Sequence, residues 1–482
     1  MGVGRGFRRP PGAGKWLVSD CRRGHGAAYF RLIKSRKATR LKPDIWDKAN
    51  FICLRCRDKA LNCSRRMPDL PTRNHLREIA GVIERIATLY RQIPDWFGRD
   101  VVIPFAATRL ALCLVGWLAF YLFRLPITFP QAWQVGADGN QHLVTTISGD
   151  LHPLVNMWSR WDTGWYLEIA KSGYSYRPGY PSSVAFFPLY PLLIRAVHTI
   201  LHLPSTDYWF LVSGIVTSNI CLIAALIYFY KILTIDFSKN VASRANLYLL
   251  IFPTSFFLSS VYAESLFLAL VLSAFFYART NRWIVACILA ALAALCRSQV
   301  IVIGVPLLVE YLQQRNFNVR QIKWNVLAFA FIPAALIGFV FYLYVKFGSW
   351  SLIFDVQQAW GRRLMWPWHT LSWVLAHAPA LGANHHEWID LGFLTLLLVA
   401  AVVGLYLLRP CYSLYLWFSV LFLSSWGMLG SVPRFDVVVF PLFIVMAILG
   451  TRSYAFHVAY VIMASMMAAL FMILHSQWNW VA

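Results

Sequence analysis

Residues 264–313 read ESLFLALVLSAFFYARTNRWIVACILAALAALCRSQVIVIGVPLLVEYLQ, and this segment indicates the class of fold. It holds three consecutive apolar runs, 264–279, 283–297 and 299–313, separated by Thr280-Asn281-Arg282 and by the single residue Ser298. A helix needs about 20 mostly apolar residues to cross the hydrocarbon core of a bilayer, and these runs lie at or below that length. We therefore predict a series of closely connected membrane-spanning helices.

The composition of the whole chain supports the same class. Of its 482 residues, 59% are hydrophobic and only 13% are charged. An ordinary soluble domain has about 25% charged and about 45–50% apolar residues. These values exclude a water-soluble enzyme, a disordered chain and a disulfide-stapled secreted scaffold. We predict an all-α polytopic membrane protein.

The first hundred residues differ from the rest, with 23 basic and 9 acidic residues. We predict that 1–98 forms a flexible, basic cytoplasmic tail near anionic lipid. A transit peptide and a natural start at Met67 are the alternatives. Residues 74–92 have apolar side chains at helical spacing and predict an amphipathic helix. Cys53 and Cys56 form a CxxC pair, but a zinc site wants a second pair, so free thiols are favoured.

Eleven apolar segments are candidates for membrane spans in the domain 99–482. They are 101–123, 208–230, 245–261, 264–279, 283–297, 299–313, 325–345, 390–408, 411–429, 435–450 and 454–474. A further apolar segment, 186–203, contains two prolines and an arginine, and we place it at the membrane surface or in a re-entrant helix.

The charges of the loops assign their sides. Beyond residue 100, the loops assigned to the inside hold ten basic and two acidic residues, whereas the outer segments hold ten of each. This is the positive-inside pattern, and it places the amino terminus in the cytoplasm. The two long loops, 124–207 and 346–389, then face outward. Long ordered loops on a rigid scaffold often carry the reactive residues, so we expect an outer or lumenal active site with interfacial helices in these loops.

The densest constellation is WSRWDTGWYLEIAKSGY, residues 158–174. Its aromatic residues recur at helical spacing, which suits a helix lying in the headgroup layer. Such a helix would hold Asp162 at the membrane–water boundary beside Arg160, where a carboxylate can take a proton from a hydroxyl group. An amphipathic anchor with a solvated Asp–Arg pair is the alternative interpretation.

Further charged residues map to the same outer face. Glu264 lies in a turn between two spans, where a carboxylate is costly, and it suits either a structural ion pair or substrate binding. Arg297, Arg362, Arg363 and Arg434 also lie there, and arginine suits a phosphate because its planar fork donates two hydrogen bonds. A lipid headgroup contact is the alternative for any single one of them.

The sequence favours no cofactor. His385, His386 and Glu387 have no third ligand at a suitable spacing, so a metal there is disfavoured, although a divalent metal stays possible. There is no DxD motif, GxGxxG or P-loop, which argues against nucleotide-sugar and ATP sites. Nothing indicates a nucleic-acid partner.

Several motifs resemble those of the PIG-V mannosyltransferase family. They are Arg160-Trp161-Asp162 with Gly173-Tyr174, Ala185-Phe186-Phe187-Pro188-Leu189-Tyr190-Pro191, Pro253-Thr254-Ser255-Phe256-Phe257, Tyr262-Ala263-Glu264-Ser265-Leu266-Phe267, Phe347-Gly348, Gln357, Trp360-Gly361-Arg362 and Pro433-Arg434-Phe435. They keep their order from about residue 100 to about residue 450, and the first hundred residues have no counterpart.

This resemblance implies a GT-C type glycosyltransferase, a multi-span enzyme that uses polyprenyl-phosphate sugars at the outer or lumenal face. Its acidic residue in the first large loop would be Asp162. Eukaryotic members add the second mannose of the GPI anchor from dolichyl-phosphate mannose in the endoplasmic reticulum, whereas bacterial relatives would act at the plasma membrane on unknown lipid or glycan acceptors.

The predicted reaction is an inverting displacement with Asp162 as the catalytic base. The predicted substrate-binding residues are Arg160, Trp161, Glu264, Arg297, Gln357, Trp360, Arg362 and Arg434. The alternative is a non-catalytic transporter or flippase of a lipid-linked sugar. The chain shows no internal repeat and has long outer loops, and both features count against a transporter.

Overall fold

The computed structural model describes residues 94–123, 152–377 and 387–481, and all the regular structure in these ranges is helical. The described residues belong to one compact unit, Leu89–Ala482. The predicted amphipathic helix 74–92, the pair Cys53 and Cys56, and His385 with His386 lie outside the described residues.

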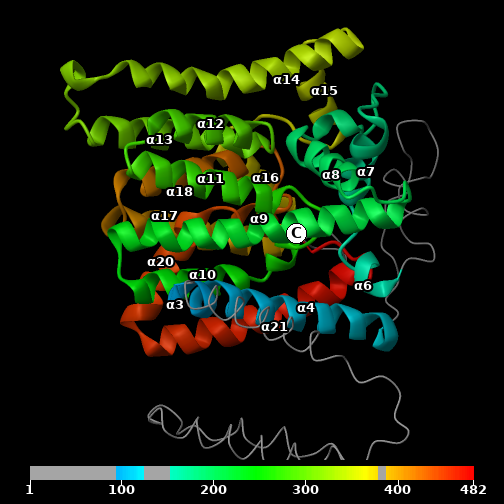
Figure 1. The fold of residues 1–482 in the computed structure, drawn as a ribbon, viewed down its shortest axis with the longest axis horizontal. Coiled ribbons are helices and arrows are strands. Elements are labelled where there is room, and N and C mark those ends of the chain that lie inside the picture. Colours follow the sequence, from blue (N-terminus) through cyan, green and yellow to red (C-terminus); the bar gives the residue numbers. More distant parts are fainter. Residues whose placement is uncertain (1–93, 124–151, 378–386, 482) are drawn as a thin grey trace, which may run out of the picture. The chain divides into compact units, whose positions relative to one another are not determined.

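Five helices are long and apolar enough to cross a membrane among the described residues. They are Asp95–Leu122 (α3, η1 and α4), α9 (Asp207–Asp236), Trp324–Phe347 (η7 and α14), α17 (Glu387–Leu407) and α21 (Tyr454–Ser476). Figure 1 shows α4 and α21 side by side at one edge of the bundle and α14 at the opposite edge, next to α12. Several of these helices expose large apolar side chains, such as Leu110 at 70%, Val345 at 67% and Met466 at 68%. Such surfaces suit lipid, and the chain is a membrane protein.

Shorter helices fill the spaces between the long ones. Those that fall on predicted spans are α10 (Lys239–Leu250), α11 (Glu264–Arg279), α12 (Trp283–Ala294), α13 (Ile301–Gln313), α18 (Pro410–Ser424) and α20 (Phe440–Arg452). Helix α11 packs against α9 and α12, α10 packs against α20, and α13 packs against α18. Helix α11 matches its predicted span 264–279 at both ends, whereas the other five are shorter than their predicted spans. All six are shorter than the roughly 20 residues that cross a hydrocarbon core, and the count of eleven is not confirmed.

The predicted span 245–261 shows why hydropathy overestimates helix length. Helix α10 ends at Leu250 and is followed by turns and the 3-10 helix η4 (Ser255–Leu258). Pro253 cannot continue the hydrogen-bond ladder of a helix. The Arg109 guanidinium donates 2.8 Å hydrogen bonds to the carbonyls of Leu250 and Ser255. Buried Arg109 therefore satisfies the backbone groups that the break would leave unpaired in an apolar environment.

Smaller helices gather at one end of the bundle, where α7, α8 and α15 lie together in Figure 1. These helices and their neighbours are α6 (Pro153–Asn156), α7 (Thr163–Ser172), η3 (Ser183–Ala185), α8 (Leu189–Ile200), α15 (Leu352–Ala359), α16 (Pro367–His377) and α19 (Val432–Asp436). Helix α8 has 12 residues, which is too short to span and agrees with the surface helix predicted within 186–203.

The predicted aromatic stripe of 158–169 differs from the structure. Helix α7 begins only at Thr163, and Trp161 has a φ of 53° that interrupts a helix. Trp158 and Trp165 are buried inside the protein, at 6% and 5% exposed. These aromatic side chains therefore build the core beneath the loop and do not face the headgroup layer.

Candidate active site

Asp162 lies where the loop after α6 becomes α7. Trp161 before it is in the left-handed region that non-glycine residues rarely adopt. Asp162 is the N-cap residue of α7, where an aspartate side chain usually accepts a hydrogen bond from the first turn, but its carboxylate makes no such bond. The carboxylate pairs with the Arg434 guanidinium instead. The turn thus directs an acidic side chain away from its own helix and toward a distant segment.

The loop that carries Asp162 is held by buried hydrogen bonds. The Tyr262 hydroxyl accepts from the Asp162 amide (3.2 Å) and donates to the Arg160 carbonyl (2.8 Å). The Arg160 guanidinium donates to the Ser476 carbonyl from Nε (3.2 Å) and Nη2 (2.9 Å) and to the Asn156 carbonyl (2.5 Å). Burial lowers the pKa of Arg160 to about 9. Arg160 is therefore a clamp between this loop and the end of α21.

Glu264 organises two of the predicted arginines. It is the first residue of α11 and is fully buried. Its Oε1 accepts from Nε of Arg434 at 2.5 Å and also pairs with Nη1 of Arg297. Arg434 therefore bridges Glu264 and Asp162, and a single buried carboxylate fixes two guanidinium groups. Buried charges need such partners, because an unpaired ion in a low-dielectric interior is very costly.

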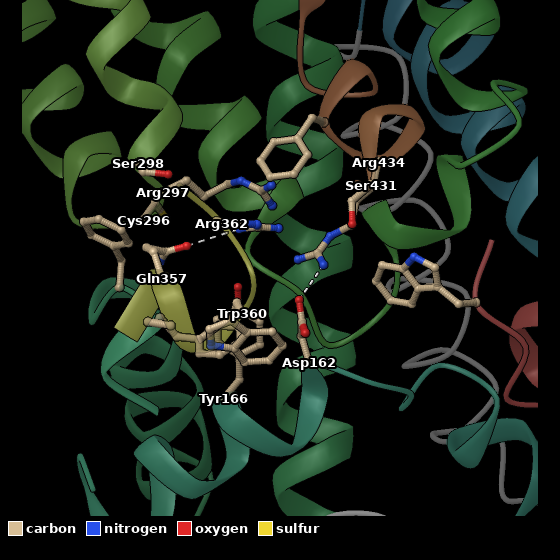
Figure 2. Close-up of a pocket in the computed structure, with 15 residues that line it drawn as sticks. Asp162, Tyr166, Cys296, Arg297, Ser298, Gln357, Trp360, Arg362, Ser431 and Arg434 are labelled. Carbon is tan, nitrogen blue, oxygen red and sulfur yellow. Dashed lines mark hydrogen bonds and ion pairs between the residues drawn. The ribbon is translucent and has the colours of Figure 1, made fainter. Parts of the chain in front are cut away.

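Arg362 completes a group of three cations. Its Nη1 donates to Oε1 of Gln357 at 3.4 Å. Desolvation by the surrounding protein lowers the pKa of Arg362 to about 10, and the positive charges of Arg434 and Arg297 act in the same direction. Figure 2 shows the guanidinium groups of Arg297, Arg362 and Arg434 converging on the space above Asp162. Three guanidinium groups against the carboxylates of Asp162 and Glu264 leave a net positive site that suits an anion.

Asp162 and the three arginines line a cavity of about 110 Å³, which we call the polar cavity (Figure 2). Tyr166 and Trp360 form part of its wall. Trp360 packs edge-on against Trp165 and Phe186 at centroid distances of 6.1 and 6.0 Å. The polar cavity thus combines a carboxylate, three guanidinium groups and aromatic rings, a lining that suits a ligand with both an anionic and an apolar part.

A second cavity of about 270 Å³ adjoins the first, and we call it the apolar groove. Its side chains come mainly from α14, α15 and the end of α18, including Phe339, Phe354 and Phe422. Both cavities share the residues Ala185, Phe187, Ser298, Gln357, Arg362 and Phe435. The polar cavity and the apolar groove therefore share part of their wall.

The structure brings together most of the predicted site. Asp162, Arg297, Gln357, Trp360, Arg362 and Arg434 all line the polar cavity. Arg160, Trp161 and Glu264 do not line it: Arg160 and Glu264 are buried partners of other groups, and Trp161 packs on neighbouring tryptophans. The site is therefore built in two layers, with Arg160 and Glu264 behind the residues that face the cavity.

Sequence reasoning missed several lining residues, among them Tyr166, Ser431 and Trp480. Tyr166 lies within the quoted segment 158–174, but its side chain gave no chemical signal apart from its aromatic neighbours. Trp480 lies more than 300 positions from Asp162, and nothing in the local sequence near it indicates a site.

The described residues offer no candidate metal centre, because no three His, Cys, Asp or Glu side chains come together within them. The carboxylates of the polar cavity have guanidinium partners, and an anionic ligand suits this pocket better than a cation does.

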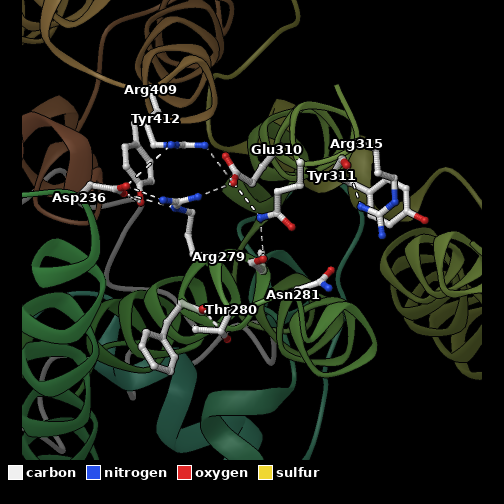
Figure 3. Close-up of polar contacts among 12 residues, drawn as sticks. Asp236, Arg279, Thr280, Asn281, Glu310, Tyr311, Arg315, Arg409 and Tyr412 are labelled. Carbon is white, nitrogen blue, oxygen red and sulfur yellow. Dashed lines mark hydrogen bonds and ion pairs between the residues drawn. The ribbon is translucent and has the colours of Figure 1, made fainter. Parts of the chain in front are cut away.

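A second charged cluster lies at the other end of α11 (Figure 3). The Arg279 guanidinium donates to Glu310 at 2.8 Å and also pairs with Asp236. Arg409 approaches Glu310 at 3.4 Å, and the Tyr412 hydroxyl donates to Asp236 at 3.2 Å. Two carboxylates and two guanidinium groups balance, and they join α9, α11, α13 and α18. This arrangement is that of a structural clamp.

The fold and site define a class, a helical membrane protein with a cationic cavity beside an apolar groove. A comparison with protein families matches the model described as Mannosyltransferase (PIG-V) to residues 143–429. The match covers more than half of the chain, so the chain belongs to the PIG-V mannosyltransferase family and is a glycosyltransferase. No curated protein matches the chain. The family match includes Asp162 and Arg362 but ends before Arg434.

Proposed function

We propose that this chain is an inverting mannosyltransferase of the GT-C type. It would take a mannosyl residue from a polyprenyl- or dolichyl-phosphate donor and transfer it to a lipid-linked or glycan acceptor at the outer or lumenal face. The observation that carries this proposal is that the polar cavity and the apolar groove adjoin and share the lining residues Gln357, Arg362 and Phe435. A sugar phosphate suits the first space and a prenyl chain suits the second.

The reaction follows from the positions of the charged groups. The acceptor hydroxyl oxygen attacks the anomeric carbon while its proton passes to the Asp162 carboxylate. The bond from the anomeric carbon to the phosphate oxygen breaks, and polyprenyl phosphate leaves with the electron pair. Arg362, Arg434 and Arg297 stabilise the charge that develops on the phosphate, because they are already fixed before the reaction. The activated phosphate linkage supplies the energy, so the step needs no ATP.

Arg434 links donor binding to the base. Its Nη1 pairs with the Asp162 carboxylate. A donor phosphate would offer Arg434 a second anion, and sharing Arg434 would release an Asp162 oxygen for the acceptor proton. Glu264 keeps the Nε side of Arg434 fixed during this exchange.

The proposal that the polar cavity faces the outer or lumenal side rests on the distribution of charged residues among the loops. The inside loops carry ten basic and two acidic residues beyond residue 100. Glu264 and Arg279 are the two ends of α11, and Arg279 lies in one of these basic inside loops. The polar cavity at the Glu264 end would then face outward.

The donor class gives the direct test. Purified protein is incubated with a membrane lipid extract as acceptor and either radiolabelled polyprenyl-phosphate mannose or a radiolabelled nucleotide mannose. We expect labelled product only from the lipid-phosphate donor. Equal transfer from the nucleotide sugar would overturn the proposed donor. Movement of intact donor across vesicles without any transfer would favour the transporter alternative.

A further inference from the structure

The segment after α21 reaches the polar cavity, and Trp480 forms part of the cavity wall together with Asp162. The segment is firmly anchored. The Ser476 carbonyl accepts two hydrogen bonds from Arg160, and the side-chain Nε2 of Gln477 donates to the Ala119 carbonyl at 3.2 Å. Trp478 has a φ of 61°, which turns the chain so that it can continue to Trp480. This segment is therefore held in a fixed position as part of the cavity wall.

The Trp480 ring has a defined orientation. It packs edge-to-face on Trp161 with a centroid distance of 5.0 Å and an interplanar angle of 77°. Trp161 also contacts Trp478 at 6.2 Å. Trp480 is only half-buried, so part of its ring surface borders the open space of the cavity. A rigid aromatic ring that stays partly open inside a cavity offers an apolar face to a ligand.

The two cavities divide the wall of the site into two sides. Gln357, Arg362 and Phe435 line both the polar cavity and the apolar groove, so the donor would enter along this side. Asp162 and Trp480 line the polar cavity alone. In an inverting displacement the nucleophile approaches opposite to the leaving group. The acceptor would then approach beside Asp162, where Trp480 lies.

We infer that Trp480 is the platform on which the acceptor stacks, and that the acceptor presents a sugar ring beside Asp162. This inference rests on the proposed function. The C–H face of a pyranose ring is flat and apolar enough to cover an indole, whereas a plain alkyl alcohol would gain little from a tryptophan held at this angle. The inference narrows the acceptor from any lipid or glycan to a glycosylated one.

The test measures acceptor and donor dependence separately in the full chain. Labelled polyprenyl-phosphate mannose is the donor, and the amount of membrane lipid extract is varied. We expect Trp480→Ala to raise the half-saturating amount of extract about tenfold, while the donor KM stays within about twofold. Trp480→Phe, which keeps an aromatic face, should recover most of the loss. Trp388→Ala is the matched control, because Trp388 is 51% exposed at the start of α17 and lines neither cavity.

A second arm asks whether the acceptor is a sugar. Treating the extract with periodate, which cleaves the vicinal diols of sugars, should abolish its acceptor capacity. Full capacity after treatment would overturn the inference. So would an unchanged extract dependence in Trp480→Ala, or donor and extract constants that rise together with a lower melting temperature. No transfer by the wild-type protein to the untreated extract would instead refute the proposed function, and this inference with it.

Discussion

The buried carboxylates of Glu264 and Asp162 fix the orientation of two arginine side chains in the site. Glu264 is fully buried and holds both Arg297 and Arg434, and Asp162 pairs with the other side of Arg434. Because each guanidinium has a fixed partner, the cationic site is organised before any ligand arrives, which lowers the cost of stabilising a phosphate in the transition state. Arg362 contributes the third cation, and its guanidinium donates a hydrogen bond to the Gln357 side chain.

Two adjacent arginines allow a matched test of this cationic site. Arg362 lines both cavities, whereas the neighbouring Arg363 is exposed and lines neither. We expect Arg362→Ala to raise the donor KM at least about tenfold, because a charge-assisted hydrogen bond to phosphate contributes about 1.5–3 kcal/mol. Arg363→Ala should stay within about twofold. Equal donor KM values in the two variants would remove Arg362 from the donor site.

At the scale of elements, a broken helix places two site segments. Between α10 and α11 the chain turns through η4, so that Tyr262 reaches the Asp162 loop and Glu264 begins α11 at the cavity. Arg109 of α4 stabilises this break by donating hydrogen bonds to the carbonyls of Leu250 and Ser255. These hydrogen bonds explain why the apolar helix α4 contains an arginine at position 109.

The loss of this support can be measured. Arg109→Met removes four buried hydrogen bonds from a charged donor, two to the carbonyls of Leu250 and Ser255 and two to the hydroxyls of Ser255 and Ser259. We expect the free energy of unfolding in detergent to fall by about 3 kcal/mol. Arg282→Met is the control, because Arg282 is exposed to the surroundings of the protein. Substitutions at exposed positions usually change the free energy of unfolding by about 0.5 kcal/mol or less. Equal stability of the two variants would show that Arg109 does not support the break.

The sequence predicted helices better than it predicted their lengths. Apolar runs identified the five long spans, because hydropathy is what a membrane helix requires. The shorter segments also read as spans, but Pro253 and the late starts of α13 and α20 shorten the helices. For the site, the motifs located Asp162 and its cations. They could not show that Arg160 and Glu264 are buried behind the cavity, since burial depends on distant segments such as Ser476.

At the scale of the whole molecule, two charged clusters mark the ends of one helix. Glu264 begins α11 and Arg279 ends it, so 16 residues place the clusters about 22 Å apart. The cluster around Arg279 is balanced and joins four helices (Figure 3), whereas the cluster around Glu264 carries excess positive charge at a cavity. The bundle thus has one end joined by a balanced ion cluster and one end with a cationic cavity.

The orientation of these ends can be tested by labelling. Single cysteines are introduced at Gln358 and Asn240, both exposed, in a variant whose own cysteines are replaced by serine. The positive-inside charges predict that a membrane-impermeant thiol reagent labels Gln358→Cys from the outer side and Asn240→Cys only after the membrane is opened. The reverse pattern would place the polar cavity in the cytoplasm and refute the outer active site.

The most direct measurement compares Asp162→Asn with Asp355→Asn in mannosyl transfer from labelled polyprenyl-phosphate mannose. Asp355 is an exposed aspartate on α15 that lines neither cavity and hydrogen-bonds to Ser351 at 2.6 Å. We expect Asp162→Asn to fold and to bind the donor but to lose transfer by at least about a hundredfold, since its amide cannot take the acceptor proton. Asp355→Asn should transfer at the wild-type rate. A normal rate in Asp162→Asn would contradict the assignment of the catalytic base.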